Sequence, residues 1–512
     1  MFDLNESPKE ECGIIGIFAP DEAVARMAFF GLYALQHRGQ EAAGIAVADG
    51  QTLSMYKNVG LVSQVFRPST LEELQGHYAI GHTRYSTTGS SLMRNAQPFM
   101  IETMNGPLAL AHNGNLVNSA ELRDEMLRQG VGFSSSSDSE VMTMMLARDA
   151  GATWEARIKD AMKKWVGAYS LVILTRDCVY AVRDPWGFRP LSVGRLPSGG
   201  YVVASETGAL RTLGCDAIRD VKPGEIVALS ANALTVTQAL PPVSPSAKCV
   251  FEFIYFARPD QTWEGVNVHA VRQKLGEELA RESGFGGNGL GSGKTDRGNG
   301  LGNRETDGGN GLGNREADGE TEACRRMADV VIPVPDSSTP AAIGFSRVSG
   351  IPFNDGFIKN RYVGRTFIEP TDSLRKRGVA LKFNVITENV LGKRVVVIDD
   401  SIVRGNTTGP LIKLLRQAGA REVHMCITCP PIKHPCFMGV DMGKYEDLIA
   451  HKRSVDGIRQ EVGADSLTYL SLAGMMHAVG RADGYCQACF TGNYPVAVNL
   501  SSAKTGFERG TK

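Results

Sequence analysis

A strand-like run that ends in two acids has the most specific chemistry in this sequence. Residues 395–409, VVVIDDSIVRGNTTG, place Asp399 and Asp400 after an apolar strand, and a loop with Gly405 then leads into a helix. Backbone N–H groups at such a helix start bind phosphate, because they lack partners and lie at the positive end of the helix dipole. The two carboxylates supply acceptors for a vicinal diol, directly or through a hard cation such as Mg²⁺. A 5-phosphorylated ribose would satisfy both groups.

A simpler interpretation is that these acids only cap the following helix, with Thr407 as a further cap. A cap needs one acceptor and not this whole string, so we favour a ligand site. The stretch resembles the signature of the type I phosphoribosyltransferases, in which the acids bind the ribose hydroxyls and the loop binds the 5-phosphate. The resemblance implies a phosphoribosyl pyrophosphate site made of Asp399, Asp400, Ser401, Gly405, Asn406, Thr407 and Thr408.

An upstream stretch has the same form of strand, tight loop and helix start. It reads VIPVPDSSTPAA and covers residues 331–342. By resemblance it is the pyrophosphate loop, with Asp336 and Ser337 beside the phosphates and the metal. The same resemblance implies Mg²⁺ at Ser337, Asp399 and Asp400. Because pyrophosphate is the leaving group, catalysis should rest on metal and cationic stabilisation and on the exclusion of water.

A basic segment lies between those two loops. It reads KNRYVGRTFIEP over residues 359–370 and places Lys359, Arg361 and Arg365 around Gly364. A solvated basic loop is one interpretation, and a lid that closes over pyrophosphate is the other. The family resemblance favours the lid, with Lys359 and Arg361 among the residues that bind phosphoribosyl pyrophosphate.

A cysteine near the amino terminus is the candidate nucleophile. Cys12 follows an acidic, polar leader and precedes the apolar run GIIGIF. A lone cysteine before an apolar strand is more often a core residue than a catalyst. The same half, however, contains LQHRGQEAAGIA (35–46), GHTRYSTTG (81–89), AHNGNL (111–116) and SSDSE (136–140). Together and in this order, these motifs closely resemble the N-terminal-nucleophile glutaminase domain of the glutamine amidotransferases.

Hydrolysis of the side-chain amide of glutamine suggests a role for several residues of these motifs. The planar fork of Arg84 suits the α-carboxylate of glutamine, and Asp138 suits its ammonium group. Asn113 and the N–H of Gly114 could form the oxyanion hole. Arg38 is similar to a family arginine in the glutamine loop, so we expect it to contribute to glutamine binding.

The glutaminase reaction also needs a general base. An α-amino group has a reference pKa of about 8 and can serve if the nucleophile is itself the first residue. We therefore expect residues 1–11 to be removed, by the chain itself, so that Cys12 becomes residue one. His37 and His82 are alternative bases, although each more often orders a loop.

Four further cysteines are candidates for a cluster. Cys486 and Cys489 form a Cys-x-x-Cys pair, which suits zinc, an iron–sulfur cluster or a redox couple. The resemblance adds Cys249 and Cys436, where the iron–sulfur subgroup of the family places its other two ligands. Four thiolates suit a [4Fe–4S] cluster. Its role would be structural, because neither expected reaction is redox chemistry.

Two domains must position these residues. From 13 to about 240, short strand-like runs lie among helical stretches, which predicts layered sheets with helices outside. The Pro- and Ser-rich segment 239–248 predicts the connection between domains. After it, strands such as 329–334 and 394–399 alternate with helices, which predicts a parallel sheet with helices on both faces.

The resemblance implies a mixed α+β and α/β fold. An N-terminal-nucleophile hydrolase αββα sandwich would cover 12–240, and a type I phosphoribosyltransferase parallel-sheet α/β domain 241–512. Residues 284–323 repeat GNGLG at an interval of eleven residues, and no core can be buried at that period and composition, which predicts a disordered insertion. RDPWGFRPL (183–191) and ASETGAL (204–210) also resemble this family and are expected to build the scaffold and the domain interface.

Composition excludes several classes of protein. The 512 residues contain 55 Lys and Arg and 55 Asp and Glu, so nothing favours nucleic acid or an anionic membrane as a general partner. The sequence has no membrane-spanning stretch and no secretory signal, so we expect a cytoplasmic protein. Cysteines in that compartment are rarely disulfides. Cys426 and Cys429 repeat the Cys-x-x-Cys spacing, but HMCITCPP reads as a buried strand, which favours core positions.

A glutaminase half and a phosphoribosyltransferase half in one chain resemble the amidophosphoribosyltransferase family, in its cluster-containing, propeptide-bearing subgroup. The resemblance implies ammonia transfer from glutamine to 5-phosphoribosyl-1-pyrophosphate, which gives 5-phosphoribosylamine, glutamate and pyrophosphate at the entry to purine synthesis. It also implies internal passage of ammonia, a homotetramer, and feedback inhibition by AMP, GMP, ADP or GDP.

Two alternatives are weaker. Amidotransferases that make glucosamine phosphate or asparagine share the first half, but they lack the signature at 395–409. A ligand-sensing transcription regulator could share the second half, but it would not need Cys12, Arg84, Asn113 and Asp138 together, and a basic DNA-binding element is not evident.

Overall fold

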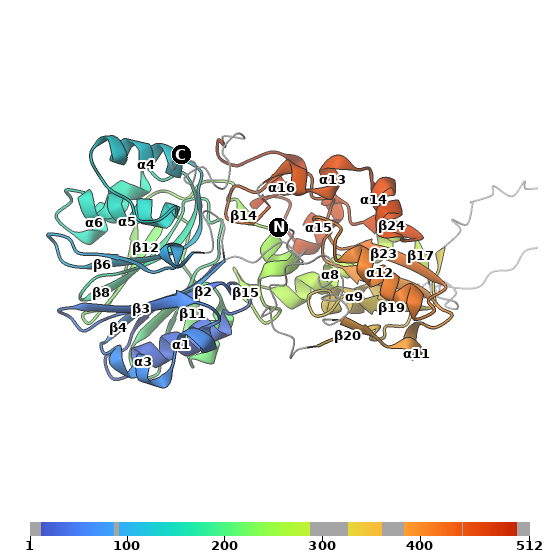
Figure 1. Ribbon diagram of the computed structural model, residues 1–512, viewed down its shortest axis with the longest axis horizontal. Coiled ribbons are helices and arrows are strands. Elements are labelled where there is room, and N and C mark those ends of the chain that lie inside the picture. The colour runs from blue at the N-terminus through green and yellow to red at the C-terminus, as the bar shows by residue number, and fades with distance from the viewer. Residues whose placement is uncertain (1–11, 86–91, 287–325, 361–382, 443, 499–512) are drawn as a thin grey trace, which may run out of the picture.

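The computed structural model describes residues 12–85, 92–286, 326–360, 383–442 and 444–498. Two halves lie side by side along the long axis, the first coloured blue to green and the second yellow-green to red (Figure 1).

Several predictions from the sequence lie outside the described residues. They concern the leader 1–11, most of the insertion 284–323, and the lid residues Arg361, Gly364 and Arg365.

The first half is built on two antiparallel sheets. One sheet has the strand order β11 (Asp216–Asp220), β9 (Ser192–Arg195), β10 (Tyr201–Ala204), β1 (Gly13–Phe18), β4 (Tyr78–Arg84), β2 (Ala42–Ala48), β3 (Leu53–Val59). The other has the order β13 (Leu234–Gln238), β12 (Glu225–Ser230), β8 (Cys178–Arg183), β7 (Gly167–Leu174), β6 (Leu108–Leu116), β5 (Phe99–Ile101). β1 lies between β10 and β4, and β6 lies between β5 and β7.

A shared core joins the two sheets. Ile14 and Ile80 from one sheet belong to the same buried cluster as Val172 and Val179 from the other. Gly16 allows this close approach, because a Cβ at that position would stand 2.8 Å from a methyl carbon of Val179. The glycine spacing of GIIGIF therefore has a packing reason.

Helices cover the outer faces of both sheets. Figure 1 shows α4 to α6 above the sheets and α1 and α3 below them, which gives the expected αββα layers. The helices of this half are α1 (Val24–Ala34), α2 (Val62–Val65), α3 (Pro68–Glu73), η1 (Met93–Asn95), α4 (Ser119–Arg128), α5 (Asp138–Arg148), α6 (Trp154–Met162) and α7 (Thr207–Thr212).

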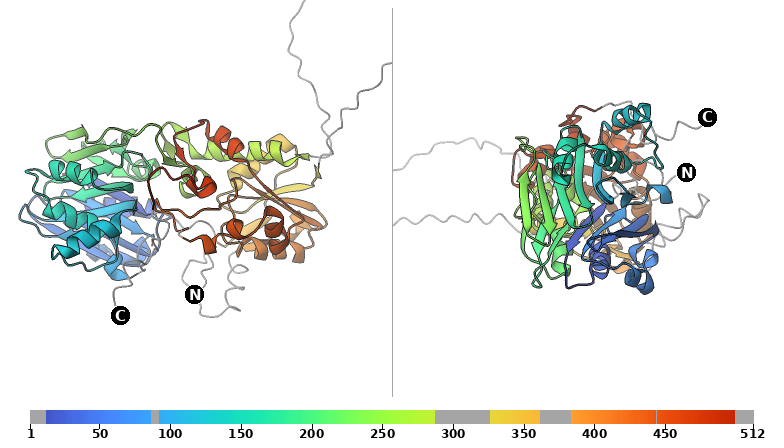
Figure 2. Two further views of the ribbon diagram at one scale, coloured as in Figure 1. Left: turned by 90° about the horizontal axis from the view of Figure 1, so that it is seen from above. Right: turned by 90° about the vertical axis from the view of Figure 1, so that its left-hand side faces the viewer.

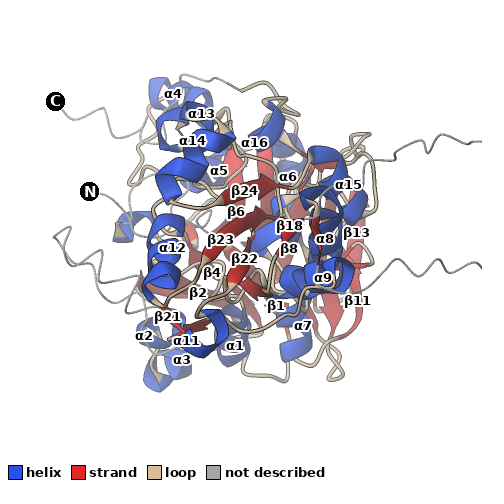
Figure 3. Ribbon diagram, turned by 90° about the vertical axis from the view of Figure 1, so that its right-hand side faces the viewer, coloured by secondary structure: helices blue, strands red, loops and turns tan. Residues whose placement is uncertain are grey.

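The second half contains the predicted parallel sheet. Its order is β19 (Val330–Pro333), β22 (Arg394–Asp399), β23 (Glu422–Ile427), β24 (Ser466–Tyr469), and every neighbouring pair is parallel. Figure 3 shows α8 (Val268–Ser283) and α9 (Thr339–Ser349) on one side of these strands, with α12 (Thr408–Gln417) and α14 (Val455–Val462) on the other. Helices on both faces of a parallel sheet confirm the predicted α/β architecture.

Smaller elements complete this half. The helical ones are the π-helix η2 (Glu252–Phe256), α11 (Thr387–Val390), η3 (Tyr445–Asp447), α13 (Ile449–Lys452), α15 (Leu472–Val479) and α16 (Ala488–Thr491). The two-stranded pairs are β14 (Lys248–Cys249) with β25 (Tyr485–Cys486), β15 (Thr262–Trp263) with β16 (Val266–Asn267), β17 (Phe285–Gly286) with β18 (Arg326–Met327), and β20 (Phe357–Lys359) with β21 (Phe383–Val385).

The end of the chain returns to the junction between the halves. β25 pairs in parallel with β14, directly after the 239–248 connection. Val496 and Val498 pack against a cluster that contains Ala168 and Phe188 of the first half and Met438 of the second. The left-hand view of Figure 2, from above, again shows the two halves side by side. Among the described residues, no helix is long and apolar enough to cross a membrane.

Candidate active site

Cys12 lies immediately before β1 in a buried position, with 6% of its surface exposed. Its thiol donates to the carbonyl oxygen of Tyr85 at 3.4 Å, and the Tyr85 N–H lies 3.5 Å from the sulfur. Tyr85 follows β4, the direct antiparallel neighbour of β1. The pairing of these two strands therefore holds the thiol beside the end of β4.

The surroundings of Cys12 favour the protonated thiol. Burial raises its pKa to about 11, although the Tyr85 backbone and the Arg84 guanidinium act in the opposite direction. A group that removes the proton is therefore needed for nucleophilic attack near neutral pH.

β6 places the expected oxyanion donors. Asn113 is 1% exposed, and its side-chain Nδ2 is buried without a hydrogen-bond partner among the described residues. An unsatisfied buried amide is costly, which suits a donor kept for a ligand oxygen. Gly114 follows in β6 with a φ of +149°, and a Cβ there would stand 2.0 Å from the Ala168 carbonyl oxygen.

Arg84 and Asp138 come to the same site from different elements. Arg84 ends β4 and Asp138 begins α5, and both side chains are almost wholly buried. Both act on the pKa of the Cys12 thiol, Arg84 lowering it and Asp138 raising it. Asp138 also accepts the Leu116 N–H at 3.0 Å, which ties the start of α5 to the end of β6. The structure thus brings together Cys12, Arg84 and Asp138, and Asn113 lies on β6, the strand that Asp138 contacts at Leu116.

Arg38 contacts the backbone of Cys12. Its Nε donates to the Cys12 carbonyl oxygen at 3.3 Å, and its Nη1 donates to Glu206 at 2.6 Å. Nη2 donates to Glu252 of the second half at 2.6 Å. The expected role in glutamine binding stays a prediction, and these contacts connect Arg38 to the backbone of the nucleophile.

The two histidines considered as bases have other partners. His82 Nε2 donates to the His112 carbonyl at 3.1 Å, and burial lowers the His82 pKa to about 3, so its ring is neutral. His37 Nε2 lies 2.8 Å from Glu206. Both histidines order the surrounding structure.

In the second half, the two predicted phosphate loops leave the same edge of the parallel sheet. β19 and β22 are neighbours in register, with Pro333 opposite Ile398. The loop after β19 contains Asp336 and Ser337, and the loop after β22 starts at Asp400. Ligands bind at the carboxyl ends of strands in such sheets, so the topology brings the two predicted subsites together.

Short hydrogen bonds connect the two loops. Ser337 Oγ donates to Asp400 Oδ2 at 2.6 Å, and Ser401 Oγ donates to Asp400 Oδ1 at 2.7 Å. Ser338 Oγ lies 3.4 Å from Asp399 Oδ1. Burial raises the pKa of Asp400, while the bonds from Ser337 and Ser401 lower it. Asp399 and Asp400 therefore form an oriented pair of carboxyl groups at the end of β22.

The loop after these acids runs into α12 as expected. Gly405 has a φ of +80°, and a Cβ there would stand 2.7 Å from Ile449. Asn406 is exposed, and Thr407 is the N-cap residue of α12, which begins at Thr408. The helix N-terminus therefore lies beside the carboxylates.

One of the three predicted lid cations, Lys359, lies within the described residues. Lys359 ends β20, and its Nζ lies 3.0 Å from Asp336 Oδ2 in the neighbouring loop. This ion pair places a cation beside the predicted pyrophosphate loop.

The four predicted cluster cysteines gather at the domain junction. Cys249 and Cys486 are partners in the β14–β25 pair, and Cys436 and Cys489 pack against the same core cluster as Cys249. Burial raises the pKa of Cys249, Cys486 and Cys489, and other thiols of this group raise it further. Among the described residues, no group of three or more His, Cys, Asp or Glu side chains is arranged to hold a single metal ion.

The segment after Cys436 packs against the oxyanion strand. Asn115 Nδ2 donates to the Phe437 carbonyl at 2.9 Å. Gly439 lies against Gly114, since a Cβ on Gly439 would stand 3.0 Å from the Gly114 carbonyl carbon. From the same half as Gly114, Arg189 donates from Nε to the Met438 carbonyl at 3.1 Å. Residue 189 belongs to the RDPWGFRPL motif, whose expected interface role agrees with this contact.

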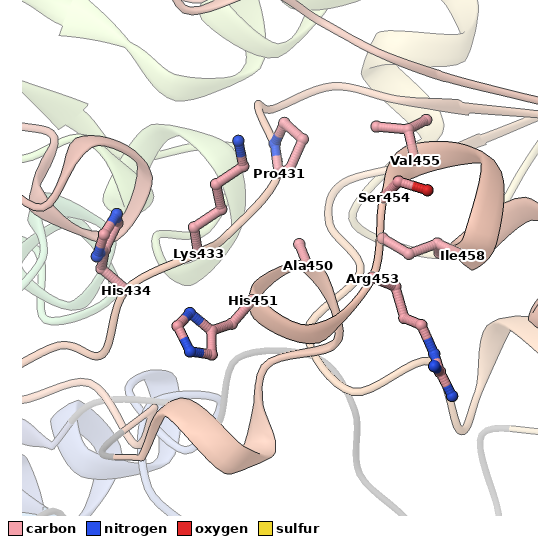
Figure 4. Close-up of a pocket in the computed structure, with 9 residues that line it drawn as sticks. All are labelled: Pro431, Lys433, His434, Ala450, His451, Arg453, Ser454, Val455 and Ile458. Carbon is pink, nitrogen blue, oxygen red and sulfur yellow. The ribbon is translucent and has the colours of Figure 1, made fainter.

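A pocket of about 330 Å³ lies elsewhere in the second half (Figure 4). Its walls come from 431–434 and 450–458, and none of the predicted site residues lines it. Two of its basic residues are already engaged, since Arg453 Nε bonds Glu461 at 3.1 Å and His434 Nδ1 lies 3.3 Å from the Tyr445 hydroxyl. We assign it no part in the chemistry.

Sequence reasoning missed three charged residues that are buried around the two sites. Glu206 and Glu252 bind Arg38, and Arg272 Nε donates to the Phe253 carbonyl at 2.9 Å. Glu206 stands in the ASETGAL motif, which was expected to build the scaffold and the domain interface, without a role for this carboxylate. Charges far apart in sequence show their pairing only after folding.

Comparison with known proteins identifies the family. Residues 82–212 match the model of a glutamine amidotransferase domain. The amidophosphoribosyltransferase of Synechococcus elongatus is 46% identical over 499 residues, which cover 96% of this chain and 93% of that protein. The Methanocaldococcus jannaschii amidophosphoribosyltransferase is 43% identical over 506 residues, which cover 96% of this chain and 98% of that protein.

Solved structures agree over nearly the whole chain. The allosteric regulatory enzyme of purine biosynthesis matches with a TM-score of 0.84 and 41% identity, covering 97% of this chain and 99% of that one. The Bacillus subtilis glutamine phosphoribosylpyrophosphate amidotransferase, in complex with ADP and GMP, matches with a TM-score of 0.83 and 40% identity. The match covers 97% of this chain and 100% of that one. These matches confirm the two-domain fold, and the chain belongs to the amidophosphoribosyltransferase family.

Proposed function

We propose that the two sites described above act in sequence, the first releasing ammonia and the second consuming it. As a member of its family, the chain is an enzyme that transfers ammonia from glutamine to 5-phosphoribosyl-1-pyrophosphate. The products are 5-phosphoribosylamine, glutamate and pyrophosphate, and the reaction is the first step of purine biosynthesis. One observation supports these residue assignments. The same chain contains a buried thiol, Cys12, and a pair of carboxyl groups, Asp399 and Asp400, at the end of a parallel strand.

In the proposed first reaction, the Cys12 thiol attacks the side-chain amide carbon of glutamine. Arg84 pairs with the α-carboxylate and Asp138 with the α-ammonium group, because both charges are buried near the thiol. Asn113 Nδ2 and the Gly114 N–H donate to the oxyanion, which is consistent with the absence of a partner for Asn113 Nδ2 among the described residues. Ammonia leaves, and water then releases glutamate from the thioester.

The α-amino group of Cys12 is the proposed base. It exists only after removal of residues 1–11, which lie outside the described residues. The need for a base is supported by the raised pKa of the Cys12 thiol. Intact-mass measurement of active protein should show the loss of these residues, and full activity with the leader retained would contradict the proposal.

In the proposed second reaction, the loops after β19 and β22 hold phosphoribosyl pyrophosphate. The α12 N-terminus and Thr407 bind the 5-phosphate, and Asp399 and Asp400 address the ribose hydroxyls. Ammonia attacks the anomeric carbon, and pyrophosphate departs beside Ser337 and Lys359. Arg361 belongs to the same proposed subsite and lies outside the described residues.

Mg²⁺ is the proposed metal of the second site. Mg²⁺ is often bound through one or two carboxylates together with substrate phosphates, so no complete protein cage is required. The oxygen donors Asp399, Asp400 and Ser337 fit this pattern, since Ser337 and Asp400 are hydrogen-bonded at 2.6 Å. When bound, the ion would neutralise charge on the leaving pyrophosphate.

A [4Fe–4S] cluster is the proposed group at Cys249, Cys436, Cys486 and Cys489. The donor set fits, because four thiols from three separate segments converge closely enough for neighbouring thiols to raise the pKa of Cys249, Cys486 and Cys489. Each thiolate of a cubane binds a different iron, so these sulfurs need not be arranged around one ion. The cluster would connect the β14–β25 pair to the segment that packs on β6.

Three further properties of the family are proposed for this chain. They are a cytoplasmic location, a homotetrameric assembly, and regulation by purine nucleotides, the last supported by the related structure that contains ADP and GMP. Gel filtration with light scattering tests the assembly, and rate measurements with added AMP, GMP, ADP and GDP test the regulation.

A direct test measures glutamate and pyrophosphate in one reaction that contains glutamine and 5-phosphoribosyl-1-pyrophosphate. The proposal predicts that both form at equal rates. Glutamate formation without pyrophosphate release, at saturating concentrations of both substrates, would contradict coupled action of the two sites.

A further inference from the structure

The guanidinium group of Arg38 connects the nucleophile to both halves of the chain. Nε donates to the Cys12 carbonyl at 3.3 Å and Nη1 donates to Glu206 at 2.6 Å. Glu252 receives two bonds, from Nη2 at 2.6 Å and from Nη1 at 3.0 Å. Glu252 opens η2 in the second half, so one side chain bridges the domain junction at the residue that performs the thiol chemistry.

These three charged side chains are completely buried. Burial alone would lower the pKa of Arg38, but Glu252 and Glu206 raise it above its ordinary value. Arg38 is therefore charged and held in a two-bond fork by Glu252, the geometry in which arginine binds carboxylates best. Such a pair fixes orientation, because leaving either charge unpaired in the interior is strongly unfavourable.

Glu252 itself has a fixed position. Arg272 of α8 donates to three carbonyls in and just after η2, those of Phe253, Tyr255 and Ala257, at 2.8 to 2.9 Å. The π-helical turn is thus anchored on the longest helix described in the second half. The carboxylate that holds Arg38 is rigidly placed relative to that half.

The contacts of Arg38 differ from those of a substrate ligand. Its Nε, Nη1 and Nη2 all donate to acceptors of the protein itself. The thiol of Cys12 is held on its other side by Tyr85. Arg38 and Tyr85 therefore restrain the backbone and the side chain of Cys12 from two directions.

We propose that Glu252 is a positioning residue for the thiol chemistry, which it supports by holding Arg38 against the Cys12 carbonyl. This inference rests on the proposed function, in which Cys12 is the nucleophile. A residue of the acceptor domain is thus part of the framework that orients the ammonia-releasing site, and Arg38 belongs to that framework and not to the glutamine ligands.

The test compares Glu252→Gln with the full-length parent enzyme in two assays. The kcat of glutamine-dependent pyrophosphate release should fall about 10- to 100-fold, because the substitution removes the negative charge of residue 252 and one of the two acceptors that bind Arg38. The KM for glutamine should change less than about threefold, since no substrate contact is lost. Ammonia-dependent pyrophosphate release should stay within about twofold of the parent, because it bypasses the thiol.

Two further variants sharpen the result. Glu252→Asp keeps the negative charge on a side chain that is one methylene shorter. Its kcat should lie between that of Glu252→Gln and that of the parent. If Glu252→Gln does not fold, the kcat of Glu252→Asp tests the proposal in its place. Glu264→Gln is the matched control, because Glu264 also pairs with Lys248 and Arg183 near the junction without contacting Arg38. It should leave both activities near those of the parent.

Thiol reactivity gives an independent measurement. The rate at which iodoacetamide inactivates glutamine-dependent activity should fall in Glu252→Gln, because the thiol is less well oriented. A selective rise in the KM for glutamine would overturn the proposal and favour Arg38 as a substrate ligand. An equal loss of both activities would overturn it as well, since it would indicate general damage to the junction.

Failure of the underlying function would look different. If Cys12→Ala retained glutamine-dependent activity, Cys12 would not be the nucleophile, whatever the behaviour of Glu252→Gln. If Cys12→Ala lost that activity while Glu252→Gln kept the parent kcat and thiol reactivity, only the positioning role would be wrong.

Discussion

At the scale of single residues, the glutaminase site combines groups that are costly to bury. The Cys12 thiol is held protonated by its surroundings, with a pKa of about 11 because burial outweighs the nearby Arg84. Asn113 keeps a buried amide nitrogen without a partner among the described residues. Such costs are typical of a site that is organised for a transition state, where the developing charges supply the missing partners.

Asn113→Ala tests the oxyanion assignment. Loss of one oxyanion donor should lower glutamine-dependent kcat by about 10²- to 10³-fold with little change in KM. Ammonia-dependent synthesis should be unaffected and serves as the internal control. The kinetic constants for both nitrogen sources check this, and a change confined to KM would contradict the assignment.

At the scale of elements, the second site follows from strand order. β19 and β22 are parallel neighbours, so the loops that follow them meet at one edge and Ser337 reaches Asp400 at 2.6 Å. The proposed phosphate loop precedes α12, and a helix N-terminus favours a bound anion. No single residue makes this site; the register of two strands does.

Asp400→Asn tests the acid pair. It should lower both glutamine-dependent and ammonia-dependent pyrophosphate release by at least about 100-fold, because the proposed ligand of the ribose diol and of Mg²⁺ is lost. Hydrolysis of glutamine to glutamate without acceptor should persist, since Cys12 is untouched. Loss of glutamine-dependent synthesis alone would contradict the placement of Asp400 in the acceptor site.

The buried Glu206 predicts a particular dependence of stability on pH. Burial would raise its pKa, but His37 and Arg38 lower it to about 2 from an ordinary value of 4.5. A lowered carboxyl pKa stabilises the folded state above pH 4.5, and this contribution is lost as the pH falls towards 2.

Glu206→Gln should therefore destabilise the protein by about 3–5 kcal/mol near neutral pH. The difference from the parent should shrink below pH 4.5. Thermal unfolding of both proteins from pH 7 to pH 3 measures this difference in stability. A difference that stays constant over this range would show that the charge of Glu206 is not the cause.

Much of both sites could be predicted from local sequence. Asp399, Asp400 and Ser337 follow strands as the strand-to-loop pattern predicts, and Arg84 and Asp138 lie close enough to Cys12 to act on its pKa, while the roles of these residues stay predictions. The strands 394–399 and 422–428 were located within a residue of β22 and β23. The positions of such strands can be predicted from periodicity alone, because an apolar run with clear boundaries marks where each strand begins and ends.

The pairing of buried charges could not be predicted in that way. Glu252 lies 214 positions from Arg38 in sequence, and nothing local marks it as a partner. The π-helical turn η2 was also missed, because its form depends on Arg272 binding its carbonyls. Long-range contacts of this kind are visible only in the folded chain.

At the scale of the whole molecule, contacts between the halves lie next to the proposed glutaminase site. The segment after Cys436 contacts Asn115 and Gly114, Arg38 contacts Glu252, and Val496 and Val498 pack against the cluster that contains Ala168 and Phe188. Three separate structures thus join the glutaminase domain to the phosphoribosyltransferase domain.

The proposed cluster predicts a measurable metal content. Anaerobically purified protein should be brown and contain about four irons per chain, because four thiolates bind one cubane. Cys436→Ser should lose iron and also lower the melting temperature, since Cys436 precedes the segment on β6. Iron and sulfide analysis with visible spectroscopy checks this. Colourless protein that contains zinc would contradict the cluster.

The most direct measurement of the central claim compares the two nitrogen sources in Cys12→Ala. Pyrophosphate release from 5-phosphoribosyl-1-pyrophosphate is followed with saturating glutamine and, separately, with ammonium chloride at alkaline pH. The account predicts that glutamine-dependent release falls below detection while ammonia-dependent release stays close to that of the parent enzyme. Retained glutamine-dependent release, or equal loss of both activities, would contradict the claim that Cys12 supplies ammonia to a separate acceptor site in the same chain.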